Sequence, residues 1–218
     1  MRKLYSIIIA LFAATSLSAQ TLTVSYKGSI NPTTWKGGEE ATVTFSHFPK
    51  TVADFKKAQE QLGSRPEGAV VLQLMAFEMW HKDPKMGKEC IELCNVSTNY
   101  YSVESRIKEV YRKNDSYGRE HLVATYLGGS TPENGFNPKK PYTVRVRSSK
   151  VHPYERAQSL KGYVLYLEVY SSGYDTHWRG CEVVKQKGSP YYKVSNSPSM
   201  YVQCQEVPFD APDYKNNL

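Results

Sequence analysis

The most concentrated apolar segment of the chain runs from Ala69 to Trp80, where only Gln73 and Glu78 are polar. A helix over Pro66–Lys82 would be apolar on nearly every side, and such a helix has to be enclosed by the rest of the fold. The segment is too short to span a bilayer, which needs about 20 apolar residues. We therefore predict a buried helix here, around which the other elements pack.

A shorter helix is predicted immediately before this segment. Thr51 and Asp54 match a capping box, and an apolar repeat at helical spacing follows them as far as Leu62. Ser64, followed three residues later by Glu67, provides a second start signal. We interpret Ser64 as the cap of the buried helix.

Two further helices are predicted after the buried helix. Asp83 and Pro84 mark a break and a restart, and the next helix runs to about Cys94. The repeat over residues 103–111 indicates another amphipathic helix. Residues 116–127 are ambiguous, and we expect a short helix around 122–126.

Strands are predicted at both ends of the chain. Residues 21–26 and 41–45 alternate between apolar and polar and are separated by a glycine-rich loop, which predicts an N-terminal hairpin. Residues 128–141 are rich in glycine and proline and predict a long exposed loop. Beyond this loop the period changes to two, and the predicted strands are Tyr142–Arg147, Tyr163–Tyr170, Gly180–Gln186, Tyr191–Ser195 and Tyr201–Val207.

The order of these elements predicts an α+β fold, because helices come first and strands come together afterwards. We expect an N-terminal hairpin, three to four helices, and an antiparallel sheet of four to five strands packed on the helices. The expected divisions are an N-terminal β-hairpin extension over 20–48, an α+β domain over 49–207 and a flexible tail over 208–218.

Residues 1–19 have the pattern of a cleavable signal peptide. Arg2 and Lys3 precede an apolar run from Leu4 to Leu17, and small residues lead to a cut after Ala19. The apolar run is short for a membrane span. We expect a soluble, exported product with a periplasmic or secreted location and no integral membrane segment after cleavage.

The net charge of the chain limits the classes of partner that are expected. Removing residues 1–19 takes away Arg2 and Lys3 and no acid, so the 28 basic and 21 acidic residues become 26 and 21, a net charge of +5. This excess is spread along the chain and does not reach the density of a nucleic-acid footprint. We expect no nucleic-acid partner.

The four cysteines leave two alternatives open. Cys90 and Cys94 lie one turn apart on a predicted helix, where disulfide geometry is unfavourable. Cys181 and Cys204 fall on two predicted strands and would pair if those strands were adjacent in an oxidising compartment. The simpler interpretation is that all four are small buried apolar side chains.

No linear motif for catalysis, phosphate binding or metal binding occurs in the chain, so we assign no catalytic, cofactor-binding or metal residue and expect no cofactor. Glu78 and His81, three residues apart on the buried helix, are candidates for a ligand site. The alternative is that Glu78 pairs with Lys82 one turn later. Trp178 is a third candidate, because the second half of the chain is rich in tyrosine and aromatic surfaces bind sugars and peptides.

Four segments resemble an uncharacterised family of bacterial proteins that carries only a domain-of-unknown-function label. These segments are Pro66–Glu78, Thr131–Gly135, Arg179–Val184 and Ser197–Gln203. The resemblance covers about residues 49–207 and leaves the N-terminal hairpin outside. It implies an exported protein of Gram-negative bacteria and supplies no activity, cofactor or site.

The function expected from the sequence is a non-enzymatic binding or interaction domain. Its partner would be a glycan, a peptide or another exported protein, bound through the sheet and its loops. The alternative is a hydrolase whose site is assembled from residues far apart in the sequence and is not visible as a linear motif.

Overall fold

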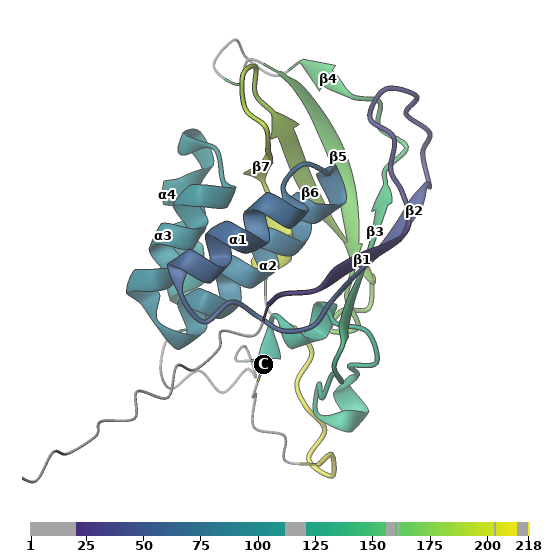
Figure 1. Cartoon of the computed structure of the whole chain (residues 1–218). Coiled ribbons are helices and arrows are strands. Elements are labelled where there is room, and N and C mark those ends of the chain that lie inside the picture. The colour runs from purple at the N-terminus through teal and green to yellow at the C-terminus, as the bar shows by residue number, and fades with distance from the viewer. Residues whose placement is uncertain (1–20, 112–120, 156–159, 161, 203, 213–217) are drawn as a thin grey trace, which may run out of the picture.

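Helices and strands form two layers in the computed structural model of the chain, which describes residues 21–111, 121–155, 160, 162–202, 204–212 and 218 (Figure 1). The helices lie on one side of a curved antiparallel sheet. The predicted signal peptide, residues 116–120 of the ambiguous stretch and residues 213–217 of the predicted tail lie outside the described residues.

The four α-helices follow one another in the first half of the chain, as predicted. Their bounds are α1 Val52–Leu62, α2 Pro66–Lys82, α3 Pro84–Cys94 and α4 Ser97–Val110. The caps explain most of these bounds, because the Thr51 hydroxyl accepts a hydrogen bond from Asp54 N at 3.1 Å and an Asp83 carboxylate oxygen accepts one from Lys85 N at 2.8 Å. Thr51 is therefore confirmed as the N-cap of α1. The predicted capping box is only half formed among the described residues, because the Asp54 carboxylate accepts from the Thr51 hydroxyl at 2.8 Å and not from the Thr51 N–H.

The start of α2 differs from the prediction. Arg65, not Ser64, is the N-cap residue, and no side chain caps the helix. The reason lies in Glu67, whose side chain is buried and paired with Arg65 at 2.5 Å. A carboxylate held in this way does not complete a capping box with Ser64.

The described strands form one seven-stranded antiparallel sheet in the order β1-β2-β3-β5-β6-β7, with β4 paired to β5. Their bounds are β1 Val24–Gly28, β2 Glu40–Phe45, β3 Tyr142–Ser148, β4 Tyr154–Glu155, β5 Tyr163–Tyr170, β6 Trp178–Lys185 and β7 Tyr192–Asn196. The predicted α+β class is therefore confirmed, whereas the predicted four to five strands are too few.

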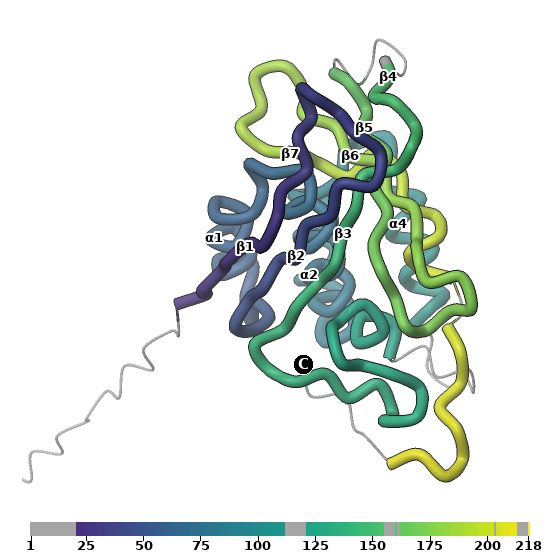
Figure 2. Tube along the Cα trace, turned by 90° about the vertical axis from the view of Figure 1, so that its right-hand side faces the viewer, coloured from purple at the N-terminus to yellow at the C-terminus, as the bar shows by residue number. Residues whose placement is uncertain are grey.

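The N-terminal hairpin is continuous with the sheet. β2 pairs with β1 on one side and with β3 on the other, where Val43 faces Val144. Figure 2 shows β1, β2 and β3 side by side in front of the helices. The hairpin is thus confirmed as a hairpin, and it supplies the first two strands of the same sheet that β3 and β5 continue.

Three stretches of irregular structure depart from the predictions. The short helix expected around 122–126 is a 3-10 turn, η2 Ala124–Tyr126. The described residues of the strand expected over 201–207, which are 201, 202 and 204–207, lie in no strand, and η4 Pro198–Tyr201 occupies its expected start. The loop over 128–141 is not fully exposed, since Phe136 is completely buried. The 3-10 turn η3, Pro132–Asn134, orders this loop, and Phe136 fills the core beside His121.

The core is centred on α2, as predicted. Every residue from Pro66 to Trp80 is buried, and the helix contacts α1, α3 and the strands β2, β3, β5, β6 and β7. The side-chain carbonyl of Gln73 accepts a hydrogen bond from the Asn95 amide at 2.7 Å, so this polar group of the helix is satisfied inside the core.

In the described part of the chain, no helix is long and apolar enough to cross a membrane.

Candidate functional site: a pocket on the helix-facing side of the sheet

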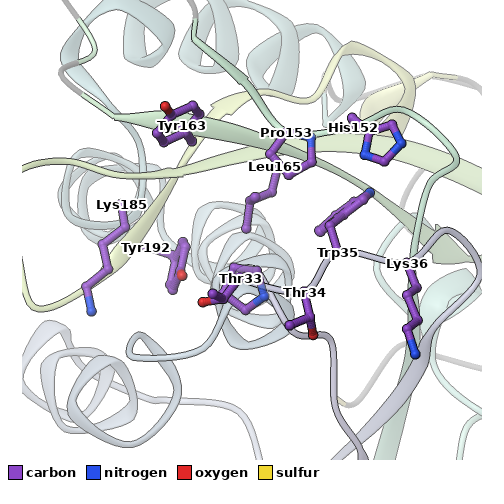
Figure 3. Close-up of a pocket in the computed structure, with 11 residues that line it drawn as sticks. Thr33, Thr34, Trp35, Lys36, His152, Pro153, Tyr163, Leu165, Lys185 and Tyr192 are labelled. Carbon is purple, nitrogen blue, oxygen red and sulfur yellow. The ribbon is translucent and has the colours of Figure 1, made fainter.

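An open pocket of about 750 Å³ lies on the side of the sheet that faces the helices (Figure 3). This volume is within the usual range for small-molecule sites. The pocket lies between the loop that joins β1 to β2 (residues 29–39) and the adjoining ends of β5, β6 and β7. The residues that line it are Pro32, Thr33, Thr34, Trp35, Lys36, His152, Pro153, Tyr163, Leu165, Lys185 and Tyr192.

The floor of the pocket is built by the sheet register. Leu165 continues the core face of β5, and Lys185 of β6 is the register partner of Tyr192 of β7. Tyr192 N–H also donates to the carbonyl of Gly63 at 2.7 Å, which ties this end of the sheet to the turn between α1 and α2. The pocket floor therefore rests on regular, hydrogen-bonded structure.

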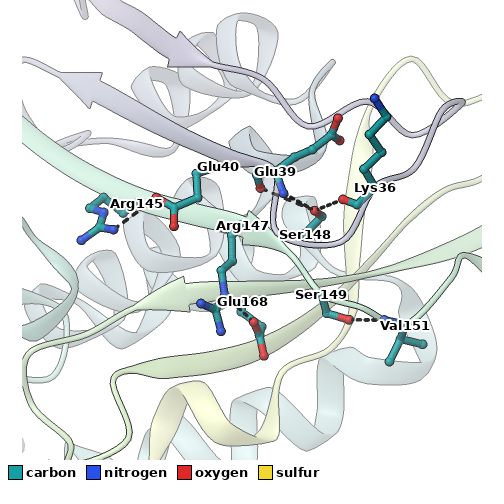
Figure 4. A network of polar contacts seen from close by, with 9 residues as sticks. All are labelled: Lys36, Glu39, Glu40, Arg145, Arg147, Ser148, Ser149, Val151 and Glu168. Atoms are coloured by element: carbon teal, nitrogen blue, oxygen red, sulfur yellow. Dashed lines mark hydrogen bonds and ion pairs between the residues drawn. The ribbon is translucent and has the colours of Figure 1, made fainter.

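The opposite wall is the loop over residues 29–39, which Ser148 holds against the end of β3 (Figure 4). The Ser148 hydroxyl donates to the carbonyl of Lys36 and accepts from Glu39 N–H at 2.9 Å. Ser148 O accepts from Gly38 N–H at 2.9 Å. These bonds fix the backbone of the loop next to Trp35.

Close packing of the same loop depends on Gly37. A Cβ atom at this position would lie 2.9 Å from the Cα of Lys150, a backbone atom that cannot rotate away. At the start of the loop, the Asn31 side-chain oxygen accepts from the N–H groups of Thr33 and Thr34 at 2.9 and 3.2 Å. The two threonines therefore reach the pocket from an ordered turn.

Three aromatic rings, those of Trp35, Tyr163 and Tyr192, give the pocket its apolar surface. Tyr163 has 61% of its surface exposed, so its ring is available to a bound molecule. Figure 3 shows Trp35 on the side of Lys36 and His152, and Tyr192 on the side of Lys185. Rings arranged in this way favour the stacking of a flat apolar group.

A buried charged group supports the floor behind Tyr192. Glu67 is fully buried on α2, and its charge together with burial raises the pKa of Tyr192. The partner of Glu67 is Arg65, whose guanidinium carbon lies 3.9 Å from the centroid of the Tyr26 ring. Burial raises the pKa of Glu67, and Arg65 offsets only part of that rise.

This raised pKa makes a pH-dependent prediction for Glu67→Gln. As pH rises above about 4.5, the ordinary value for a glutamate, the unfolded chain releases the Glu67 proton before the folded chain does. The free energy of unfolding of wild type minus that of Glu67→Gln should therefore fall with rising pH. The fall is at most about 1.4 kcal/mol for each pH unit. Urea unfolding of both proteins between pH 4 and pH 8 measures this difference.

Glu133→Gln provides a control of opposite sign. Hydrogen bonds from its own backbone N–H and from Thr131 lower the pKa of the exposed Glu133. The stability of wild type relative to Glu133→Gln should then rise as pH increases through the acid range. A difference for Glu67→Gln that is flat or that rises with pH would contradict the burial of a charged group behind Tyr192.

The residues predicted from the sequence lie elsewhere. Glu78 and His81 are near the C-terminal end of α2, whereas Glu67 and the pocket are near its N-terminal end. Glu78 is 1% exposed, and Lys82 Nζ lies 3.4 Å from its carboxylate. The alternative expectation, a pair of Glu78 with Lys82, is confirmed.

His81 and Trp178 each contact other side chains. The His81 ring stacks on Tyr111 with centroids 4.5 Å apart and planes 8° apart. Trp178 lies on the face of β6 that points away from the helices, where the Arg147 guanidinium carbon is 4.1 Å from its ring centroid. Neither residue lines the pocket.

Sequence reasoning missed Trp35, Lys36 and His152, because all three lie in loops where periodicity carries no information. Tyr163 and Tyr192 were noticed only as members of a tyrosine-rich half. A tryptophan within a glycine-rich loop was the available signal, since loops on a rigid scaffold often carry binding residues.

All four cysteines are buried, and the structure contains no disulfide between Cys181 and Cys204. Cys204 lies beyond η4 in irregular structure, so the two do not sit on adjacent strands. Burial raises the pKa of Cys90 to about 12 and raises those of Cys94 and Cys181 as well. Thiols in this state are poor nucleophiles.

Among the described residues, no group of three or more histidine, cysteine, aspartate or glutamate side chains is arranged to hold a metal ion. In a comparison with known families, the family described as Domain of unknown function (DUF6935) matches residues 47–208. The chain belongs to the DUF6935 family. No curated protein and no solved structure matches the chain.

The DUF6935 match confirms the resemblance recognised in the sequence. The matched range begins at residue 47 and so includes only part of the pocket lining. Trp35, Lys36 and the rest of the loop over 29–39 precede it. The DUF6935 domain supplies the floor of the pocket, with Leu165, Lys185 and Tyr192. The hairpin before it supplies the facing wall.

Proposed function

We propose that the chain is an exported, non-enzymatic binding protein that holds a small ligand in the pocket between residues 29–39 and the ends of β5, β6 and β7. The observation that carries this proposal is an open cavity of about 750 Å³ lined by three aromatic rings. Export is supported by the signal-peptide pattern of residues 1–19.

The composition of the lining favours a binding protein over the alternative of a hydrolase. The eleven lining residues include His152 but no serine, cysteine, aspartate or glutamate. A histidine base needs a nucleophile or a positioned water and a group that orients it. The buried thiols lie outside the lining, and burial raises the pKa values of Cys90, Cys94 and Cys181, which works against nucleophilic attack by these three.

The order of the walls supports a preformed site. Sheet hydrogen bonds fix Tyr192, and Ser148 fixes the backbone of Lys36 and Glu39. A pocket whose walls are ordered before binding loses less conformational entropy when the ligand enters.

A thermal-shift screen with glycans, short peptides and aromatic acids tests the proposal, since a ligand that binds only the folded state raises the melting temperature. For any compound that binds, Tyr163→Ala should weaken the affinity about tenfold or more, because loss of one stacking ring costs about 1.4 kcal/mol. Isothermal titration calorimetry measures the dissociation constants.

Tyr101→Ala is the matched control, because Tyr101 is 74% exposed on α4 and lies outside the pocket. Its affinity should equal that of wild type. Trp35→Ala provides a second test from the opposite wall. Ligand binding that is unchanged in both Tyr163→Ala and Trp35→Ala would exclude this pocket as the binding site.

A further inference from the structure

We infer that the ligand of this pocket is a small amphipathic anion: a flat apolar ring system that carries an acidic group. The inference rests on the proposed function and specifies its ligand class. Three observations carry it, namely the charges of the lining, the absence of partners for those charges within the described residues, and the placement of the rings between them.

The charges of the lining are of one sign. Lys36 and Lys185 line the pocket together with the imidazole of His152, and none of the eleven lining residues is acidic. The lining therefore carries two formal positive charges and no formal negative charge. Field lines from like charges are focused in such a concave site and attract an anion.

Neither lysine forms an ion pair with any described residue. Two arginines of β3 differ in this respect, since Arg145 pairs with Glu40 at 3.2 Å and Arg147 with Glu168 at 2.6 Å. Glu67, the acid behind the floor, is already paired with Arg65 at 2.5 Å. The two pocket lysines thus remain available to an external anion.

The rings lie between the two lysines. Figure 3 shows Lys185 beside Tyr192 on one side of the pocket and Lys36 beyond Trp35 on the other. The Lys185 ammonium lies 5.6 Å from the centroid of the Tyr192 ring. A ligand whose ring stacks on Trp35 or Tyr192 can therefore place an acidic group near one ammonium.

The use of lysine bears on which acidic groups fit. A guanidinium presents a fork that matches a carboxylate or phosphate in two-point geometry, whereas an ammonium is a compact point charge. The pocket lining contains lysine and no arginine. It should therefore recognise negative charge beside an apolar ring, with little preference among carboxylate, sulfonate and phosphate.

Two fluorescent probes with the same ring system test this inference. 8-Anilinonaphthalene-1-sulfonate carries a negative charge, and N-phenyl-1-naphthylamine lacks the sulfonate. We expect the anionic probe to bind wild type at least tenfold more tightly at low salt. In the double variant Lys36→Gln/Lys185→Gln, we expect its affinity to fall about tenfold and that of the neutral probe to stay unchanged.

The matched control is Lys56→Gln/Lys57→Gln, which removes two exposed lysines from α1 and should change neither affinity. Displacement of the anionic probe by 1-naphthoate and by 1-naphthalenesulfonate, two monoanions with the same ring, with similar affinities would support recognition of charge alone. A preference of more than about tenfold for one of the two would overturn recognition by point charge.

The outcomes separate this inference from the proposed function. If Tyr163→Ala weakens both probes but the pocket lysine variant weakens neither, the pocket binds ligands and the inference about charge is wrong. If Tyr163→Ala and Trp35→Ala weaken neither probe, the proposed function itself fails. Equal binding of the two probes to wild type also overturns the inference about charge.

Discussion

Gly87→Ala is expected to lower the free energy of unfolding by about 2–3 kcal/mol, the cost of forcing an extra carbon into a packed interface. Gly87 is buried on α3, where α3 packs against α2. A Cβ atom there would lie 2.1 Å from the Cα of Trp80 and 2.4 Å from its N. These are backbone atoms of α2, so only separation of the two helices relieves the overlap.

The expected loss of stability is opposite in sign to the effect that helix propensity alone would give. Alanine is a better helix former than glycine by about 1 kcal/mol, so an uncrowded site in a helix would show stabilisation. Glu89→Ala, at an exposed position of the same helix, is the control and should change stability by less than about 0.5 kcal/mol. Urea unfolding measures both variants. A Gly87→Ala protein as stable as wild type would contradict the close crossing of α2 and α3.

Local sequence signals were sufficient for some helix boundaries but not for all, since α4 begins at Ser97, six residues before the repeat that predicted it, and no side chain caps it. Thr51 and Asp54 set the start of α1, and the pair Asp83 and Pro84 set the boundary between α2 and α3. Each of these signals acts within one helical turn, so no knowledge of the tertiary fold is needed to interpret it. Ser64 was misread because the side chain three residues later, Glu67, makes a buried contact that no local rule describes.

The pairing of strands in the sheet could not be predicted from local sequence signals. The period of two identified the strands of the hairpin, but the pairing of β2 with β3 joins segments separated by all four helices. Strand partners depend on which apolar faces meet in the folded chain, and periodicity leaves that choice open. The stretch over 201–207 was apolar enough for a strand, yet Tyr201 ends a 3-10 turn and packs against Phe77 of α2.

The pocket was not predictable for the same reason. Its lining joins the loop after β1, the loop after β3 and the ends of β5, β6 and β7. The sequence drew attention instead to Glu78 and His81, because polar groups are conspicuous on an apolar helix. The structure pairs Glu78 with Lys82, places His81 Nδ1 3.9 Å from the Glu78 carboxylate and stacks the His81 ring on Tyr111, away from the pocket.

The two buried glutamates of α2 are each paired with a basic side chain near one end of the helix. Glu67 lies 2.5 Å from Arg65, behind the pocket residue Tyr192, while Glu78 lies 3.4 Å from Lys82 at the other end of the helix. Among the described residues, none of the four carboxylate oxygens accepts a hydrogen bond of good geometry. Both pairs lie close to helix ends, where long basic side chains reach solvent while the acid stays buried.

Phe77→Ala is expected to lower the free energy of unfolding by about 3–5 kcal/mol, the usual cost of removing a buried phenylalanine ring. Phe77 is fully buried on α2, and its ring centroid lies 5.8 Å from that of Tyr201 in an edge-to-face arrangement. For a chain of this size, the loss corresponds to a fall in melting temperature of roughly 6–20 °C. Thermal unfolding followed by circular dichroism measures it.

The outcome tests whether α2 organises the fold. Because α2 is buried along nearly its whole length, no exposed side of the helix can move inward to fill the space that the ring leaves. Phe77→Leu keeps part of the volume and should show a smaller loss, and Tyr101→Ala, at an exposed site, should stay within about 0.5 kcal/mol of wild type. A loss below about 1 kcal/mol for Phe77→Ala would mean that the layers around α2 close over the cavity, and that α2 is not the rigid centre on which the sheet and the other helices pack.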